Sequence, residues 1–233
     1  MTNNKQLTTL LDTIERNLTD WIPIGVKELR VKSPAYCLFL WYQDFSDDFT
    51  PHCGIATQDL LDSIHSTDLQ DPLEKFEIIW RPQQCADLEV PGRLILDECD
   101  IVENEVESCY EILAEQSGLF GDSDSIEESD DEELDADLEE DDLDREGDEE
   151  DDEEAIEREF EALAPFREMM HRVGNNLRKV DWKKILPVTD DFVVLVGDYV
   201  GYWLADDFEQ SVSPEKIASL IERGMLMAPL DGK

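Results

Sequence analysis

The sequence is poor in basic residues: 19 lysines and arginines stand against 60 aspartates and glutamates, a formal net charge of −41. Membrane surfaces and nucleic acids are themselves anionic, so we expect neither to be a direct partner. The chain also lacks an apolar run approaching the about 20 residues that cross a bilayer. Its N-terminal segment has no basic stretch and carries charges between its apolar positions, unlike a secretion signal. These absences predict a cytoplasmic protein, or one that enters a nucleus.

Motifs that carry common catalytic chemistry are absent as well. The chain contains no glycine-rich phosphate loop, nucleophile elbow, HExxH pair or calcium-loop spacing. Its five cysteines form an odd set without a CxxC pair, which argues against a disulfide framework and against a zinc ribbon. His52 and Cys53 are adjacent, but neighbours on a strand point to opposite faces and seldom share a metal. We therefore expect buried, reduced thiols and a protein that is not an enzyme and has no cofactor.

What the chain has in excess is negative charge in one segment. Between Asp122 and Glu159, 25 acidic residues face two arginines, a net charge of −23. The remainder has 35 acids and 17 bases, a net charge of −18, so the foldable part is acidic in its own right. From residue 121 to 154 there is almost nothing apolar to bury, which predicts a disordered acidic insertion. This insertion is either a polyanionic arm for a basic partner or a solvated spacer.

Three serines of the insertion precede acidic residues, a context resembling substrates of acidophilic kinases: Ser123, Ser125 and Ser129. Phosphorylation would add about −1.5 to −2 charges at each site. In a bacterium these serines would be spacers.

Periodic apolar residues predict a series of elements before the insertion. The expected elements are a helix over 7–21 that ends before Pro23, a strand over 35–45, a returning hairpin strand over 52–56, a helix capped by Thr57, a strand over 76–80, and a helix over 96–116 that Gly118 ends. The strand over 35–45 is almost continuously apolar, so we expect it to be buried on both faces and central in its sheet.

A second series of elements is expected after the insertion. It comprises a helix over 156–182 that Pro165 kinks or divides, a turn at 189–191, a strand over 192–196 continuing toward Tyr202, and a helix with Ser213 at its N-cap, Pro214 at its first position and Gly224 at its exit. A lone strand needs a sheet, so residues 1–120 and 155–233 should share one core. The predicted fold is α+β, with a mixed or antiparallel sheet flanked by helices.

Candidate partner-binding residues are acidic side chains of the insertion and of the last strand region, with one tryptophan beside them. They are Asp130, Asp131, Glu132, Glu133, Glu139, Glu140, Asp141, Asp142, Asp190, Asp191, Asp206, Asp207 and Trp203. The aspartates from 190 to 207 have alternative interpretations: a Mg²⁺ site, a carboxylate-rich catalytic site, or turn and capping roles. An exposed Trp203 would suit a protein contact, whereas a half-buried one would belong to the core.

Two segments show a pattern of aromatic, apolar and acidic positions that can be compared with a known family. The positions of this pattern in the present sequence are Tyr36, Leu38, Leu40, Tyr42 and Asp44, followed by Trp182, Leu186, Pro187, Thr189, Asp190, Asp191, Phe192 and Val193. This pattern resembles a bacterial family, domain of unknown function 4303, whose pattern does not include residues 121–154. The resemblance implies a compact α+β fold and brings no catalytic residues. Some families of similar build act as immunity proteins beside polymorphic toxins, which is an analogy of fold.

The sequence thus predicts a non-catalytic acidic interaction protein. Its expected partner is a basic protein, such as a nuclease toxin or another nucleic-acid-binding protein, because charge complementarity raises association rates by about 10- to 1000-fold. One alternative is a histone-type or other acidic chaperone that uses the acidic insertion. Another is a structural or regulatory protein in which the insertion only keeps the chain in solution.

Overall fold

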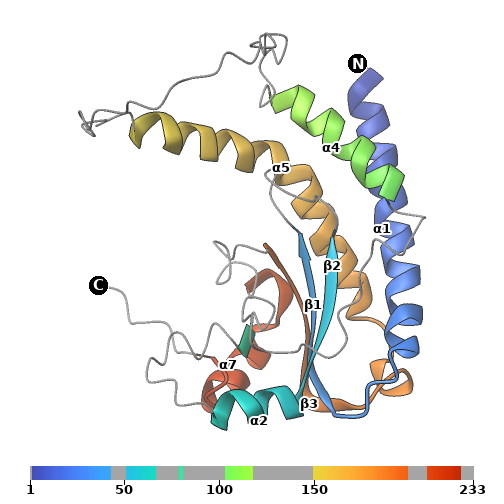
Figure 1. The fold of residues 1–233 in the computed structure, drawn as a ribbon, viewed down its shortest axis with the longest axis vertical. Helices are drawn as coiled ribbons and strands as arrows, with labels where there is room; N and C mark the ends of the chain where they lie inside the picture. Colours follow the sequence, from blue (N-terminus) through green and yellow to red (C-terminus); the bar gives the residue numbers. More distant parts are fainter. Residues whose placement is uncertain are drawn as a thin grey trace, which may run out of the picture.

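The fold is built around a three-stranded sheet with helices on both faces (Figure 1). The computed structural model describes residues 2–42, 51–66, 79–80, 103–117, 149–198 and 209–226. In the sheet, β1 (Ala35–Tyr42) lies between β2 (His52–Thr57), which is antiparallel to it, and β3 (Val188–Asp198), which is parallel to it. The predicted α+β class with a mixed sheet is confirmed, as are the hairpin of β1 with β2 and the central place of β1.

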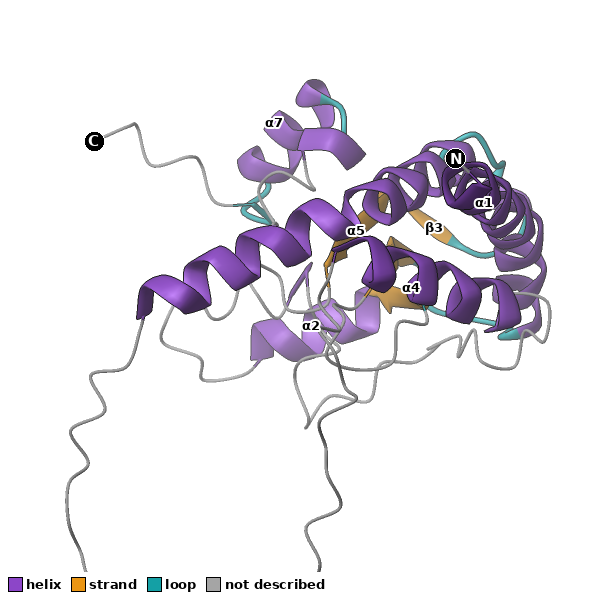
Figure 2. Cartoon of the chain, turned by 90° about the horizontal axis from the view of Figure 1, so that it is seen from above, coloured by secondary structure: helices purple, strands orange, loops and turns teal. Residues whose placement is uncertain are grey.

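Helices form a layer on each side of this sheet. They are α1 (Thr2–Glu28), α2 (Gln58–Ser66), α4 (Glu103–Ser117), α5 (Glu149–Leu177) and α7 (Pro214–Glu222), with a short 3-10 helix, η4 (Trp182–Lys184). One core cluster contains residues of α1, α4 and α5, and the other contains residues of α2 and α7. Figures 1 and 2 show α1, α4 and α5 gathered together, with α7 apart from them.

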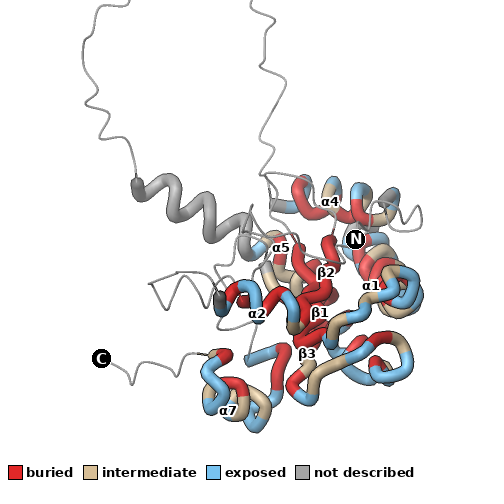
Figure 3. The backbone as a smooth tube through the Cα atoms, turned by 60° about the horizontal axis from the view of Figure 1, so that its bottom comes forward, coloured by how far each residue is buried: buried red, intermediate tan, exposed pale blue. Residues whose placement is uncertain are grey.

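The central strand explains this three-layer arrangement. All eight residues of β1 are buried (Figure 3). Because successive strand residues point to opposite faces, Leu38 and Leu40 belong to the core under α1, α4 and α5, whereas Phe39 and Trp41 belong to the core under α2 and α7. A strand covered on both sides needs apolar residues at every position, which is why its sequence does not alternate.

The two parts of the chain that flank the acidic insertion meet in this sheet. β3 comes from the C-terminal part and pairs along β1, for example Leu38 with Val194 and Leu40 with Val196. α5 crosses the same face of the sheet so closely that a Cβ atom added at Gly174 would overlap the side chain of Val196. Residues of both parts therefore contribute to one contiguous core.

Helix α1 continues beyond the end that the sequence predicts. Pro23 lies inside it, although proline cannot donate the backbone hydrogen bond to the carbonyl of Thr19 and costs about 3 kcal/mol in a helix interior. The turns around Pro23 carry Ile22 and Val26, both fully buried against the core. Burying two such side chains contributes about 1.5–3 kcal/mol each, enough to offset the proline. Tertiary packing therefore overrides the local stop signal.

Helix α5 also differs from its predicted bounds. It begins at Glu149, so residues 149–154, which the sequence places in the insertion, are helical. Glutamate is a good helix former, and acidic side chains in the first turns interact favourably with the positive end of the helix dipole. The helix passes through Pro165 without dividing and bends along its length (Figure 1). It ends at Leu177, whose carbonyl accepts a hydrogen bond of 2.8 Å from the Trp182 indole.

Two local predictions in the front part are wrong. Residues 79–80 are helical, so they do not form the predicted strand, and Trp80 is fixed by donating its indole N–H to the carbonyl of Met225 at 2.6 Å. The hydroxyl of Thr57 has no hydrogen-bond partner among the described residues, so it does not cap α2. Instead the backbone N–H of Asp59 donates to Ser33 Oγ at 3.2 Å. The capping oxygen comes from the segment before β1.

The predicted turn at 189–191 is part of β3. Between the pairs Ala35–Val188 and Cys37–Val193, Tyr36 of β1 alone lies opposite four residues of β3, 189–192. This surplus makes a bulge in the strand instead of a turn before it. The predicted residues 43–45, 76–78, 96–102, Gly118 and Tyr202 lie outside the described part of the chain.

Candidate functional site: charged surfaces of the molecule

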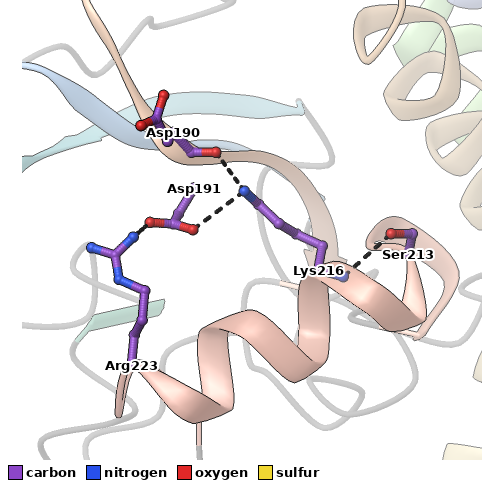
Figure 4. Close-up of polar contacts among 5 residues, drawn as sticks. All are labelled: Asp190, Asp191, Ser213, Lys216 and Arg223. Carbon is purple, nitrogen blue, oxygen red and sulfur yellow. Dashed lines mark hydrogen bonds and ion pairs between the residues drawn. The ribbon is translucent and has the colours of Figure 1, made fainter.

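The bulge of β3 places Asp190 and Asp191 beside α7. Asp191 is buried, and its carboxylate forms ion pairs with Arg223 and, at 3.4 Å, with Lys216 (Figure 4). Lys216 Nζ also donates to the backbone carbonyl of Asp190 at 2.6 Å. Burial lowers the pKa of Lys216, and the negative charge of Asp190 opposes that shift. These contacts fasten α7 to the sheet.

The ends of α7 explain how it presents these two cations. Ser213 is the N-cap and accepts from the backbone N–H of Lys216, Pro214 occupies the first turn, and Gly224 follows the last turn with φ of 69°. The capping residues predicted for this helix are confirmed. Since Asp191 is already neutralised by two cations of the same fold, its carboxylate is occupied by structural contacts, whereas Asp190 is exposed.

The other candidate partner-binding residues are not in the described part of the chain. Those outside it are Asp130, Asp131, Glu132, Glu133, Glu139, Glu140, Asp141, Asp142, Trp203, Asp206 and Asp207. Within the described part, no group of three or more histidine, cysteine or acidic side chains is arranged to hold a metal ion. No described helix is long and apolar enough to cross a membrane.

A row of carboxylates that the sequence analysis did not single out lies on α4. This helix contains five glutamates and no basic residue. Glu107, Glu111 and Glu115 recur every fourth position and are exposed, while the opposite side of the helix packs into the core through Val106, Ile112 and other buried residues. We call these three glutamates the acidic face of α4. Residues four apart on a helix are neighbours, so the spacing itself could have revealed the row.

The acidic face belongs to a larger acidic end of the molecule. α4 and the first half of α5 both lie at the end where the chain begins (Figure 1). Residues 149–161 of α5 include nine acidic residues and one arginine. The acidic insertion joins these two helices in the sequence. In the sequence, α4, the insertion and the start of α5 therefore follow one another as a largely acidic part of the chain.

A surface pocket of about 370 Å³ adds carboxylates along α1. It is lined by Asp12, Glu15, Arg16, Thr19, Asp20 and Asn176. Glu15 accepts hydrogen bonds from Arg172 Nε at 2.7 Å and from Asn176 Nδ2 at 3.1 Å, which joins α1 to α5. Asp12 and Asp20 are exposed and form no ion pair with any described residue. The pocket can therefore receive a basic side chain.

Basic side chains gather at the opposite end of α1. Residues 27–32 and 178–184 together hold seven bases and two acids, a net charge of +5. All seven basic side chains are exposed: Lys27, Arg30, Lys32, Arg178, Lys179, Lys183 and Lys184. Because β1 and β3 are parallel, the segments that precede them lie at the same end of the sheet, where Ala35 N–H donates to the Pro187 carbonyl at 2.9 Å. We call these seven residues the basic end.

Several of these bases have partners within the fold. Lys184 pairs with Asp181 at 2.8 Å, and that hydrogen bond raises the pKa of Lys184. Arg178 donates to the carbonyl of Gln210 at 3.2 Å, and burial lowers its pKa. The side chains of the other bases lack an ion pair with any described residue, apart from a hydrogen bond of Lys179 to Asn176. The unpaired ones are Lys27, Arg30, Lys32 and Lys183.

Arg30 occupies an unusual backbone conformation within the basic end. With φ of 50°, it is the one non-glycine residue in the described chain with positive φ. It follows the last turn of α1, the position at which helices most often use glycine. An L-residue costs about 1–2 kcal/mol in this left-handed region. An arginine here carries positive charge at a cost in stability.

The described cysteines are buried, free thiols: Cys37, Cys53 and Cys109. Burial raises the pKa of Cys109 to about 12 and raises that of Cys53 further. Cys53 lies in the core under α1, whereas the ring of His52 stacks near Trp41 on the other face of the sheet. Such protonated thiols are poor nucleophiles and poor metal ligands. The prediction of buried thiols is confirmed for these three, and Cys85 and Cys99 lie outside the described part.

Comparison with known proteins gives no relative: no protein-family model, curated protein or solved structure matches this chain. The resemblance to domain of unknown function 4303 stays a prediction. Several residues that carry it are buried in the sheet core, such as Tyr36, Leu38 and Leu40. Core positions of this kind bear on the fold and supply no functional side chain.

Proposed function

We propose that this chain is a non-catalytic interaction protein of the cytoplasm whose acidic end binds a basic, nucleic-acid-binding protein. The observation that carries the proposal is the acidic face of α4. Like charges four residues apart on a helix are destabilising by about 0.2–0.5 kcal/mol per pair. Glu107, Glu111 and Glu115 form two such pairs without a base on the helix to relieve them. The row does not help the protein to fold, whereas a basic partner would need it for binding.

The rest of the acidic end supports the same partner class. The carboxylates of the insertion, including those from 130 to 142, extend the negative field, and Asp190 adds an exposed carboxylate elsewhere on the fold. A field of this sign steers cationic proteins and repels nucleic acids and anionic membranes. Proteins that bind nucleic acid present basic surfaces, so a nuclease toxin is one suitable partner. The chain would then resemble an immunity protein in its mode of action.

The first test is to capture partners of the full chain from its native host at low salt and to elute them in salt steps. A basic, nucleic-acid-binding protein that elutes with steep salt dependence is expected, because screening weakens exposed charge pairs. Only neutral partners, or none at low salt, would contradict the proposal. The captured protein then serves as the probe for variants.

Variants distinguish binding through the acidic face of α4 from binding through the insertion. Replacing Glu107, Glu111 and Glu115 with glutamine is expected to slow association with the captured partner by about 10-fold at low salt. A matched control replaces three other exposed glutamates: Glu168, Glu209 and Glu222. If instead only deletion of residues 122–148 abolishes binding, the protein acts as an acidic chaperone through its insertion. If a neutral linker in their place leaves host activity unchanged, the insertion is a spacer.

A further inference from the structure

The basic end has no role in the proposed function, and we infer that it docks on the acidic face of α4 in a second copy of this chain, in head-to-tail self-association. Four cations, those of Lys27, Arg30, Lys32 and Lys183, lack an ion pair within the described chain. On α4, the three carboxylates of Glu107, Glu111 and Glu115 lie exposed in a row. The two surfaces have opposite charge, and neither forms an ion pair between these side chains and any other described residue.

The geometry prevents one molecule from joining its own two surfaces. Near its start, α1 touches the end of α4, where Gln116 Nε2 donates to Asn4 Oδ1 at 3.3 Å. At its other end, α1 leads directly into the basic end through Lys27. The 27 residues of α1 span about 40 Å at the usual helical rise. The surfaces can therefore meet only between copies.

Local charge decides whether two copies attract at this contact. The net charge of −41 repels copies at long range. The Debye length is about 8 Å at physiological ionic strength and about 30 Å at about 0.01 M. At physiological salt the charges on the two docked surfaces therefore dominate the distant acidic residues. α2 places the exposed carboxylates Asp59 and Asp62 beside the basic end, so the contact is centred on α1 and η4.

Arg30 gives independent support for a role of the basic end. Its left-handed backbone costs stability that glycine would avoid, and its side chain forms no ion pair within the described chain. Residues held in costly backbone conformations concentrate at functional sites. An exposed arginine kept at such a costly position is suited to a contact with a second copy.

The contact joins different surfaces of the two copies. Such a heterologous contact leaves one free acidic face and one free basic end on every dimer, so it propagates into chains unless the rotation closes a ring. The mean mass of the full-length protein should therefore rise steadily with concentration. A basic partner that occupies the acidic face would compete with the second copy.

Sedimentation velocity of the full chain tests the inference. At about 0.15 M salt the mean mass is expected to grow with protein concentration, and at about 1 M, where the Debye length is about 3 Å, it should return to that of the monomer. Lys27→Glu with Lys183→Glu, and separately Glu107→Lys with Glu111→Lys, should each abolish association. Lys5→Glu with Arg16→Glu makes the net charge as much more negative as Lys27→Glu with Lys183→Glu does, and it should leave association intact.

Mixing the two reversed variants separates loss of contact from loss of folding. Each variant retains one wild-type surface, so the mixture is expected to form heterodimers although each variant alone is monomeric. A monomeric mixture, or a wild-type chain that stays monomeric at about 0.15 M salt, overturns the inference. So does a wild-type monomer whose basic end binds a DNA oligonucleotide and loses it on Lys27→Glu with Lys183→Glu. None of these three outcomes depends on finding a basic partner in the host.

Discussion

The acidic end and the basic end of this molecule are built in different ways. The acidic face lies on a single helix, and the spacing of four residues between Glu107, Glu111 and Glu115 places them together. The basic end is assembled from two segments about 150 residues apart, 27–32 and 178–184, which the parallel pairing of β1 and β3 unites. A charged surface on one helix can be found from spacing, whereas one built by topology needs the fold.

The two ends share one property: each carries charge at a cost in stability. On α4 the cost is repulsion between like charges four residues apart. At the basic end it is the left-handed backbone of Arg30. The core between them has no such conflict, since its residues are apolar and closely packed. Substitutions in the core and in the two charged ends can therefore distinguish residues that stabilise the fold from residues that are kept for binding.

The largest expected effect is in the core that holds the two ends in place. Gly174→Ala is expected to destabilise the protein by about 1–3 kcal/mol, because the added methyl overlaps the buried side chain of Val196. Urea unfolding measures the change. Asn175→Ala, at an exposed position of the same helix, is the control and should stay within about 0.5 kcal/mol. Equal stability of both variants would show that α5 does not press on the sheet at Gly174.

An opposite effect is expected at the basic end. Arg30→Gly should stabilise the protein by about 1 kcal/mol, because glycine adopts positive φ without a steric penalty. Lys32→Gly removes the same charge from a position without positive φ and should cost about 0.5–1 kcal/mol. Thermal unfolding compares the two variants. Destabilisation by Arg30→Gly would mean that the side chain of Arg30 contributes more to folding than its backbone costs.

The smallest effect is expected on α4. Glu111→Gln removes both repulsive pairs in the row and should stabilise the protein by about 0.4–1 kcal/mol while slowing association with a basic partner. Glu168→Gln is the control, since Arg172 lies four residues after it and the change relieves no repulsion. Urea unfolding at low salt gives the clearest difference. A loss of stability in Glu111→Gln would remove the argument that the row is kept for binding.

The sequence predicts the elements whose signals are local. β1 has an uninterrupted apolar run, and α7 has Ser213, Pro214 and Gly224 at its ends, so both were located correctly. The predicted helix end before Pro23 is wrong, because the burial of Ile22 and Val26 that carries α1 past the proline depends on the sheet. Similarly, the cap of α2 comes from Ser33, which is distant from that helix in the sequence.

The candidate site was less predictable, because its geometry depends on pairing across the chain. The sequence shows adjacent aspartates at 190 and 191, but it does not show that Lys216 and Arg223 neutralise one of them. The row of Glu107, Glu111 and Glu115 on α4 can be predicted from the spacing of four residues, given that the segment is helical. The basic end could not be located, since nothing in the residues themselves indicates that β1 and β3 are parallel neighbours.

The strand order has a consequence for how the protein is made. Between Tyr42 and Val188, 145 residues must be synthesised before β1 gains its second neighbour. At roughly 5–20 residues per second, this leaves the most apolar strand with an open edge for roughly 7–30 seconds. Open apolar edges promote pairing with other chains. The acidic insertion is synthesised between α4 and α5. Since like charges repel, we expect it to lower the risk that neighbouring nascent chains aggregate before β3 is made.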